Sequence, residues 1–219
     1  MKYREMLLKI YRKHACFINK IPFINKIKNK GNENSFQLNK PMVHSKIICN
    51  GNNNKIFLMP GGGLDHCTFL ISGNNNTIII GDRASAVRAT ICVEDSGNVV
   101  NIGDKSSLCG EILLAACEGT KIEIGEDMLA SSHIEIRTSD SHAIYNDKGE
   151  RINAAKDIYI GKHVWIGTGV KINKGVSIGN GCIVGNGAIV TRKFENSNVI
   201  IAGNPANIVK EKIKWSKDR

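Results

Sequence analysis

The sequence predicts an all-β protein built as a parallel β-helix, a solenoid of short strands joined by tight corners. A six-residue period in the C-terminal third is the first observation: Ile160, Ile166, Ile172, Ile178 and Val184 follow one another at this spacing, and four of them precede Gly. Apolar residues recur every 3.6 residues on an α-helix and every second residue on a half-buried strand. A period of six instead indicates stacked coils, each made of three hexapeptides.

The second observation is a longer repeat in the N-terminal half. Two aliphatic rows recur every 22 residues: Ile56, Ile78, Val100 and Ile122, and then Leu58, Ile80, Ile102 and Ile124. The segments Gly51-Asn-Asn-Asn-Lys and Gly73-Asn-Asn-Asn-Thr recur at the same spacing. Gly and Asn tolerate positive φ, and stacked Asn side chains can share hydrogen bonds. We therefore predict coils with Asn-rich corners rather than a polar linker.

Composition agrees with a single domain that has a narrow core. The 219 residues suffice for roughly eight coils, and only 5% are aromatic. The seven cysteines form no Cys-x-x-Cys pair, so we predict reduced thiols, several of them in the core. No secretory signal or apolar run near the ~18 residues of a membrane span is evident, which predicts a cytoplasmic protein.

Positive charge is concentrated at the two ends of the chain. Residues 1–30 carry nine Lys or Arg and one Glu, and residues 207–219 carry five basic and two acidic residues, out of a net charge of +10. We divide the chain into a basic amphipathic N-terminal cap (1–44), a β-helix (45–206) and a basic C-terminal tail (207–219). An alternative prediction for residues 1–30 is peripheral contact with an anionic inner membrane. No nucleic-acid-binding module is recognisable.

The repeat is interrupted once, and the interruption predicts the functional site. Polar residues replace the aliphatic ones after Ile136, which predicts an extruded loop at about 138–156. His142 lies at the base of this loop, where it can serve as a general base, and Asp140 can orient it. Trp165 occupies an outward-facing slot of its hexapeptide and suggests a stacking surface.

Three segments together carry a resemblance to a known family. They are the hexapeptide run, Arg137-Thr-Ser-Asp-Ser-His142 and Ile201-Ala-Gly-Asn-Pro-Ala206. Over about residues 45–210 the chain resembles the left-handed β-helix acyltransferases. Within them it is similar to the bacterial O-acetyltransferases of capsular and other surface polysaccharides, including polysialic acid. The left-handedness comes from this resemblance and not from the spacing.

The resemblance implies a homotrimer with three acetyl-CoA sites in grooves between subunits. It places His142 on the family's catalytic base and Trp165 on a Trp important in the polysialic acid enzymes. We predict direct acetyl transfer to a sugar hydroxyl with His142 as general base, and no metal. The implied acetyl-CoA contacts are Thr168, Asn186, Thr191, Arg192, Lys193 and Lys210. Asn207 departs from the family by replacing a basic residue. From their place on the loop, we expect Tyr145, Asn146, Lys148 and Arg151 to line the acceptor entrance.

Other functions remain open from the sequence. Some trimeric β-helix proteins are zinc carbonic anhydrases, but His133, His142 and His163 lack the close pair of such a site. N-acetylation of an amino-sugar nucleotide, or acetylation of a xenobiotic, would use the same fold and donor. A trimeric scaffold without activity is the non-enzymatic alternative.

Overall fold

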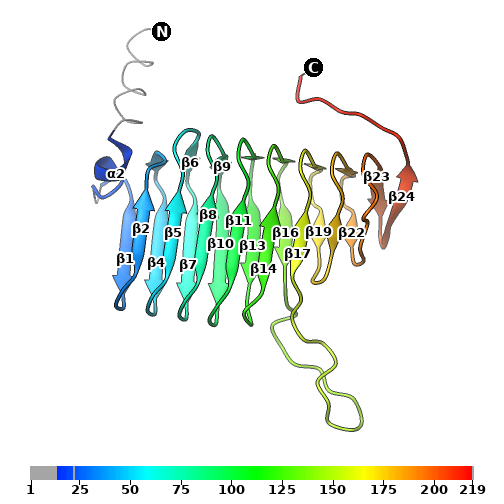
Figure 1. Cartoon of the computed structure of the whole chain (residues 1–219), viewed down its shortest axis with the longest axis horizontal. Helices are drawn as coiled ribbons and strands as arrows, with labels where there is room; N and C mark the ends of the chain where they lie inside the picture. Colours follow the sequence, from blue (N-terminus) through cyan, green and yellow to red (C-terminus); the bar gives the residue numbers. More distant parts are fainter. Residues whose placement is uncertain (1–13, 22, 219) are drawn as a thin grey trace.

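A computed structural model describes residues 14–21 and 23–218, and it confirms the predicted all-β parallel β-helix. Three parallel sheets run the length of the solenoid, and successive strands along the chain fall on successive sheets (Figure 1). A short helix, α2 (Ala15–Ile18), precedes the first strand. Among the described residues, no helix is long and apolar enough to cross a membrane.

Each sheet contains every third strand until the last two strands of the chain, which both join the third sheet. The first consists of β1 (Lys26–Lys30), β4 (Lys46–Asn50), β7 (Thr68–Ser72), β10 (Ala89–Glu94), β13 (Ile112–Ala116), β16 (Ile134–Arg137), β19 (Lys171–Ile172) and β22 (Ile189–Val190). The second consists of β2 (Ser35–Leu38), β5 (Lys55–Leu58), β8 (Thr77–Ile80), β11 (Val99–Ile102), β14 (Lys121–Ile124), β17 (Ile158–Ile160) and β20 (Ser177–Ile178). The third consists of β3 (Met42–Val43), β6 (Gly63–Asp65), β9 (Ser85–Val87), β12 (Ser107–Leu108), β15 (Leu129–Ala130), β18 (Trp165–Ile166), β21 (Ile183–Val184), β23 (Ile200–Gly203) and β24 (Ala206–Lys210).

The 22-residue register predicted from the sequence is confirmed in the second sheet. Ile56 pairs with Ile78, Val100 pairs with both Ile78 and Ile122, and Ile122 pairs across the loop with Ile158. All five side chains are fully buried. Removing an aliphatic side chain of this size from water contributes about 1.5–3 kcal/mol, so the inward rows stabilise the stack. Several cysteines fill the core, as predicted, including Cys49, Cys67 and Cys182.

A ladder of buried asparagines joins the coils at one corner. The amide oxygen of Asn54 accepts a hydrogen bond from the Asn76 backbone N–H at 3.0 Å, and Asn76 accepts one from Asn98 at 2.9 Å. Asn98 in turn accepts one from the backbone N–H of Thr120 at 3.0 Å. The Thr120 hydroxyl donates to the Cys117 carbonyl and lies 2.6 Å from the hydroxyl of buried Thr138, where the extruded loop begins. Backbone groups at this corner are thereby satisfied inside the core.

Glycine is required at this corner because consecutive coils approach closely. Gly51 has φ 135°, and a Cβ there would lie 1.9 Å from the carbonyl oxygen of Gly73. The neighbouring Asn53 and Asn75 adopt φ values of 53° and 58° and are joined by a side-chain hydrogen bond of 2.7 Å. The Asn-rich segments therefore form stacked corners, as the sequence predicted.

The β-helix begins earlier than the sequence boundary at residue 45. Strands β1 to β3 pair in register with β4 to β6, so residues 26–43 form a full coil. The sequence pattern does not indicate this coil, because β1 is Lys-Ile-Lys-Asn-Lys and Ile27 is its only partly buried residue. Before it, the buried side chain of Asn19 donates to the carbonyls of Leu38 and Lys40, so this segment caps the first coil. Residues 1–13 lie outside the described residues.

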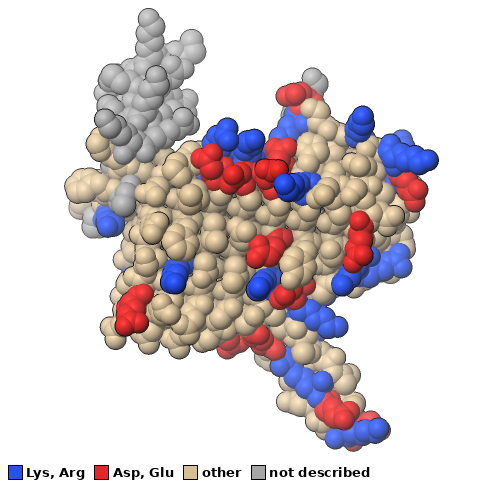
Figure 2. All heavy atoms as spheres, viewed as in Figure 1, with Lys and Arg blue, Asp and Glu red and all other residues tan. Residues whose placement is uncertain are grey.

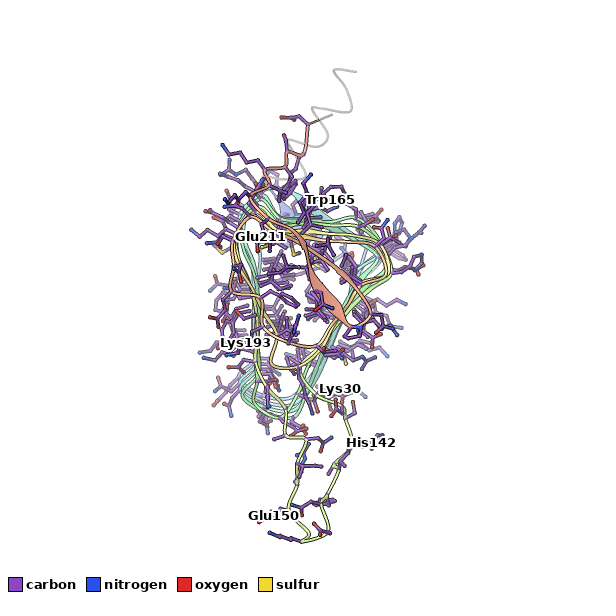
Figure 3. The ribbon with its side chains drawn as sticks, turned by 90° about the vertical axis from the view of Figure 1, so that its right-hand side faces the viewer. Lys30, His142, Glu150, Trp165, Lys193 and Glu211 are labelled. Atoms are coloured by element: carbon purple, nitrogen blue, oxygen red, sulfur yellow. The ribbon has the colours of Figure 1, made fainter. Side chains whose placement is uncertain are left out.

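The solenoid ends in a hairpin and a returning segment. Strand β24 runs antiparallel to β23, with a cis Asn204–Pro205 peptide in the turn. Viewed from this end, β24 crosses the triangular section, and Ile208 packs against the core (Figure 3). Residues 211–218 then run back along the solenoid (Figure 1). Lys, Arg, Asp and Glu are interspersed over the face shown in Figure 2, including the projecting loop.

Candidate active site

The extruded loop projects from the corner between the first and second sheets as a two-stranded arm (Figure 1). It joins β16 to β17, and its two sides meet in an antiparallel bridge between Tyr145 and Arg151. The Asn146 side chain organises the tip, because its oxygen accepts hydrogen bonds from the backbone N–H groups of Lys148 (3.0 Å) and Glu150 (2.9 Å). Of the expected acceptor residues, Asn146 therefore has a structural role, whereas Tyr145 and Lys148 are exposed.

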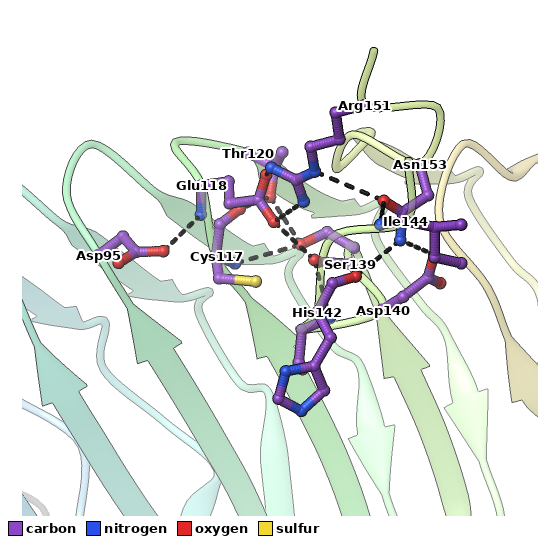
Figure 4. A network of polar contacts seen from close by, with 12 residues as sticks. Asp95, Cys117, Glu118, Thr120, Ser139, Asp140, His142, Ile144, Arg151 and Asn153 are labelled. Carbon is purple, nitrogen blue, oxygen red and sulfur yellow. Dashed lines mark hydrogen bonds and ion pairs between the residues drawn. The ribbon is translucent and has the colours of Figure 1, made fainter. Parts of the chain in front are cut away.

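Arg151 fastens the arm to the solenoid. Its guanidinium forms a bidentate ion pair with Glu118 at 2.7 and 2.8 Å, and the Ser139 hydroxyl donates to the same carboxylate at 2.8 Å (Figure 4). Bonds from Arg151 and Ser139 lower the pKa of Glu118 to about 2. Arg151 was expected at the acceptor entrance, but here its charge is already neutralised by Glu118. Sequence reasoning missed Glu118, which lies 33 residues before Arg151.

Asn153 fixes the backbone around His142. Its side-chain nitrogen donates to the His142 carbonyl at 2.8 Å, and its oxygen accepts from the Ile144 N–H at 2.7 Å. The same nitrogen donates to the Asp140 carboxylate at 2.9 Å, which also accepts a hydrogen bond from Lys174. Sequence reasoning missed Asn153 too; its only signal was an Asn where the chain returns to the repeat.

Asp140 does not orient the His142 ring as the sequence suggested. Its carboxylate is held by Lys174 and Asn153, and these bonds lower its pKa. The His142 ring points away from this network (Figure 4). Among the described residues of the single chain, the ring makes no hydrogen bond or ion pair, and the side chain is exposed. An exposed imidazole without an internal partner, next to a hydrogen-bonded backbone, is suited to receive a proton from a bound substrate.

Trp165 is exposed, as its slot in the hexapeptide predicted, but it lies far from His142. The two residues occupy opposite ends of the cross-section (Figure 3). The returning C-terminal segment places Trp215 beside Trp165, with ring centroids 6.0 Å apart. Trp215 also stacks on His163 at 4.0 Å, and its indole donates to the His163 carbonyl at 3.0 Å. The sequence did not predict this aromatic cluster, although Trp215 is the one aromatic residue in the basic tail.

Both ring nitrogens of His163 have hydrogen-bonding partners. Nδ1 lies 2.7 Å from Asp127, and Nε2 lies 3.1 Å from the carbonyl oxygen of Trp215. Lys217 donates to the second oxygen of Asp127 at 2.7 Å and so fastens the end of the tail. His133, on another corner, instead pairs with Glu111 at 3.1 Å.

The residues expected to contact acetyl-CoA fall into two groups. Thr168 and Asn186 occupy one corner on consecutive coils, where Asn186 accepts a hydrogen bond from the Thr168 N–H at 3.0 Å. Thr191, Arg192 and Lys193 follow β22 at a different corner, and all three are exposed.

The second group continues into the C-terminal hairpin. Arg192 donates to the side-chain oxygen of Asn207, and its guanidinium lies 5.2 Å from the centre of the Phe194 ring. Lys210 is the last residue of β24 and is exposed. The side chain of Asn207 therefore helps to position the Arg192 guanidinium.

The similarity of this chain to known proteins identifies its family. The family described as bacterial transferase hexapeptide (six repeats) matches residues 157–192. The solved structure of the polySia specific acetyltransferase NeuO is 33% identical and has a TM-score of 0.79; the match covers 89% of this chain and 90% of that one. The polysialic acid O-acetyltransferase OatWY is 32% identical with a TM-score of 0.84, over 90% and 92% of the two chains.

The chain belongs to the hexapeptide-repeat acetyltransferases. The match to NeuO and OatWY extends over nearly the whole chain, so it includes the irregular parts as well as the repeat. It also supports the left-handed sense of the β-helix, which spacing alone did not provide. A comparison with curated protein sequences found no significant match.

Proposed function

We propose that this acetyltransferase transfers the acetyl group of acetyl-CoA to a sugar hydroxyl of a bacterial surface polysaccharide. The observation that carries the proposal is the near full-length similarity to two acetyltransferases whose acceptor is polysialic acid. A sialic acid polymer is therefore the first acceptor to test. The exposed His142 ring on a rigidly held arm supplies the base that such a transfer needs.

His142 carries the proton transfers in this proposal. The unprotonated imidazole removes the proton from the attacking hydroxyl as the sugar oxygen bonds to the thioester carbonyl carbon. The carbon–sulfur bond then breaks, and His142 protonates the departing thiolate. The products are an acetyl ester and free coenzyme A, and no acyl-enzyme forms. A positioned general base contributes about 10²–10⁴-fold to such a rate.

We infer that the complete site forms between the subunits of a trimer. Within one chain, His142 and Trp165 lie at opposite ends of the cross-section (Figure 3). The arm also presents Ile144, Tyr145 and Ile152 with relative exposures of 52, 61 and 62%. Burying such side chains against a neighbouring chain is favourable and would carry His142 to that chain's Trp165, Thr168 and Asn186.

The bound donor would use both groups of predicted contacts. Thr168 and Asn186 offer polar groups at the corner that follows β18 and β21, where the acetyl-bearing arm of the cofactor would lie. Arg192, Lys193 and Lys210 are exposed cations near the C-terminal end and would bind its phosphates. Asn207 holds Arg192 by one donor and leaves its other N–H groups available for a phosphate.

We place the reaction in the cytoplasm, with the N-terminal end near the inner membrane. Exposed Phe17 and Phe23 alternate along the chain with exposed Lys20 and Lys26 in the described part of this end. Aromatic and basic residues together favour an anionic bilayer surface. Co-sedimentation with anionic vesicles at low salt should detect the contact, and equal recovery with neutral vesicles would contradict it.

Release of free thiol from acetyl-CoA tests the function. Surface glycans, sialic acid polymers and amino-sugar nucleotides would serve as acceptors, with His142→Ala and the control His133→Asn assayed in parallel. We expect thiol release with a hydroxyl acceptor, a loss of about 100-fold or more in His142→Ala, and little change in the control. Acetylation only of amino groups, or near-normal turnover by His142→Ala, would contradict the proposal.

A further inference from the structure

Two histidines and an aspartate gather on consecutive corners near the N-terminal end, away from the candidate active site. His44 follows β3, and His66 follows β6 one coil later, 22 residues on. The preceding residues, Val43 and Asp65, are paired in register. Both histidines adopt the same left-handed backbone, with φ of 50° and 53°. Repetition of the coil therefore aims both imidazoles in one direction, and their ring centroids lie 4.7 Å apart.

The Asp65 carboxylate completes a set of three donors. One of its oxygens lies 2.7 Å from Nδ1 of His66 and 3.8 Å from Nδ1 of His44. One donor atom from each residue lies within 4.8 Å of the other two. A tetrahedral zinc ion binds imidazole nitrogen and carboxylate oxygen at about 2.0–2.2 Å, which places its ligands roughly 3.3–3.5 Å apart. Small side-chain rotations would bring all three donors to that separation.

These three side chains are largely exposed in the part of the chain that the structure describes. The side chains of His44, His66 and Asp65 have relative exposures of 62, 56 and 50%. Solvent can therefore supply the remaining ligand of a four-coordinate ion. The Asp65–His66 contact alone would be an ordinary surface ion pair. His133 and Glu111 form such a pair at 3.1 Å on a later coil, without a second histidine.

We propose that His44, Asp65 and His66 form a binding site for a divalent transition-metal ion, with zinc as the expected occupant. Two imidazoles and one carboxylate favour zinc, nickel or cobalt over magnesium and calcium, which take oxygen ligands. An ion bound here would join two consecutive coils close to the first coil. Its role would be to clamp the N-terminal end of the solenoid, where each coil is otherwise stabilised only by its neighbours.

Calorimetric titration of the untagged full-length protein with zinc tests the site. We expect one saturable zinc site per chain at these residues, and at least tenfold weaker binding in His44→Asn and in His66→Asn. Asparagine tolerates the positive φ of both positions, so the variants keep the corner. His133→Asn is the matched control, because it removes an exposed, carboxylate-paired histidine from a similar corner; its zinc affinity should change less than twofold.

Thermal unfolding gives an independent readout. An ion that binds only the folded chain raises its stability, so zinc should raise the Tm of the wild type and of His133→Asn. It should not do so for His44→Asn or His66→Asn, and magnesium should have no effect on any of the four proteins. The proposal is overturned if the wild type shows no saturable zinc binding, or if both corner variants bind zinc as tightly as the wild type.

Discussion

Asn153 is the residue on which the position of His142 depends most. It is buried and bonds to the His142 carbonyl, the Ile144 N–H and the Asp140 carboxylate. Replacing it with alanine removes the hydrogen-bond partner of two partly buried backbone groups, at a cost of at most about 1–3 kcal/mol at the base of the arm.

We therefore expect Asn153→Ala to lower turnover strongly while the β-helix keeps its Tm within a few degrees. The measurement is acetyl transfer together with hydrogen exchange of the arm. The control Asn146→Ala disturbs only the tip and should cost less activity. Equal activity losses in the two variants would show that Asn153 has no special role.

Asp140 should matter less for turnover than its position two residues before His142 suggests. Its carboxylate bonds to Lys174 and Asn153 and the His142 ring points elsewhere, so Asp140→Asn should remove no hydrogen bond from that ring. We expect less than a tenfold loss of turnover. A loss as large as that of His142→Ala would instead support the direct Asp140–His142 interaction that the sequence suggested.

The limits of sequence reasoning are clear at these residues. His142 and Asp140 are two residues apart, and proximity alone suggested that one orients the other. The actual partners come from far away in the chain: Lys174 is 34 residues from Asp140, and Glu118 is 33 from Arg151. Which coil lies beside the loop depends on the register of the stack, and no local pattern specifies which polar side chains then meet.

The attachment of the arm to the solenoid depends on pH through Glu118. Its pKa is lowered from 4.5 to about 2 in the folded chain, chiefly by Arg151 and Ser139. A lowered carboxyl pKa means that the interaction stabilises the folded state fully above about pH 4.5 and is lost as the pH falls toward 2. Limited proteolysis of the arm should accelerate over this range. Glu118→Gln should remove most of that pH dependence, and an unchanged profile in this variant would contradict the assignment.

The asparagine ladder makes a prediction for the corner between the first two sheets. Asn76 is fully buried and bonds to the coils before and after it. Asn76→Ala should lower the free energy of unfolding by about 1–3 kcal/mol, measured by denaturant titration. The neighbouring Asn75→Gly keeps a residue that accepts positive φ at an exposed position and should cost much less. Equal costs would show that burial of the ladder is unimportant.

The C-terminal segment is the element that the sequence described least well. Its charge suggested a basic tail, but it is attached to the solenoid by the stacking of Trp215 on His163 and by the hydrogen bond from Lys217 to Asp127. Trp215→Ala should make residues 211–218 more accessible to protease and alter the fluorescence of Trp165. The exposed neighbour Lys214→Ala should change neither.

At the scale of the whole molecule, the repeat made the fold predictable from sequence. A period of six and a spacing of 22 define strand positions, corners and register together, because each coil copies the one before it. The first coil escaped detection because its strand β1 contains a single partly buried apolar residue, Ile27, among polar and basic ones. The site is less predictable because its residues lie on different coils and at opposite ends of one cross-section.

Because His142 and Trp165 lie at opposite ends of the cross-section, the proposed function requires a site that is divided between subunits. Co-expression of His142→Ala and Trp165→Ala chains with different tags, followed by purification on both tags, would isolate the proposed trimers that contain both variants. In a cyclic trimer, one interface then pairs an intact His142 with an intact Trp165, so we expect about one-third of wild-type activity where each variant alone has almost none. Mixed trimers as inactive as the parent variants would contradict a site shared between subunits.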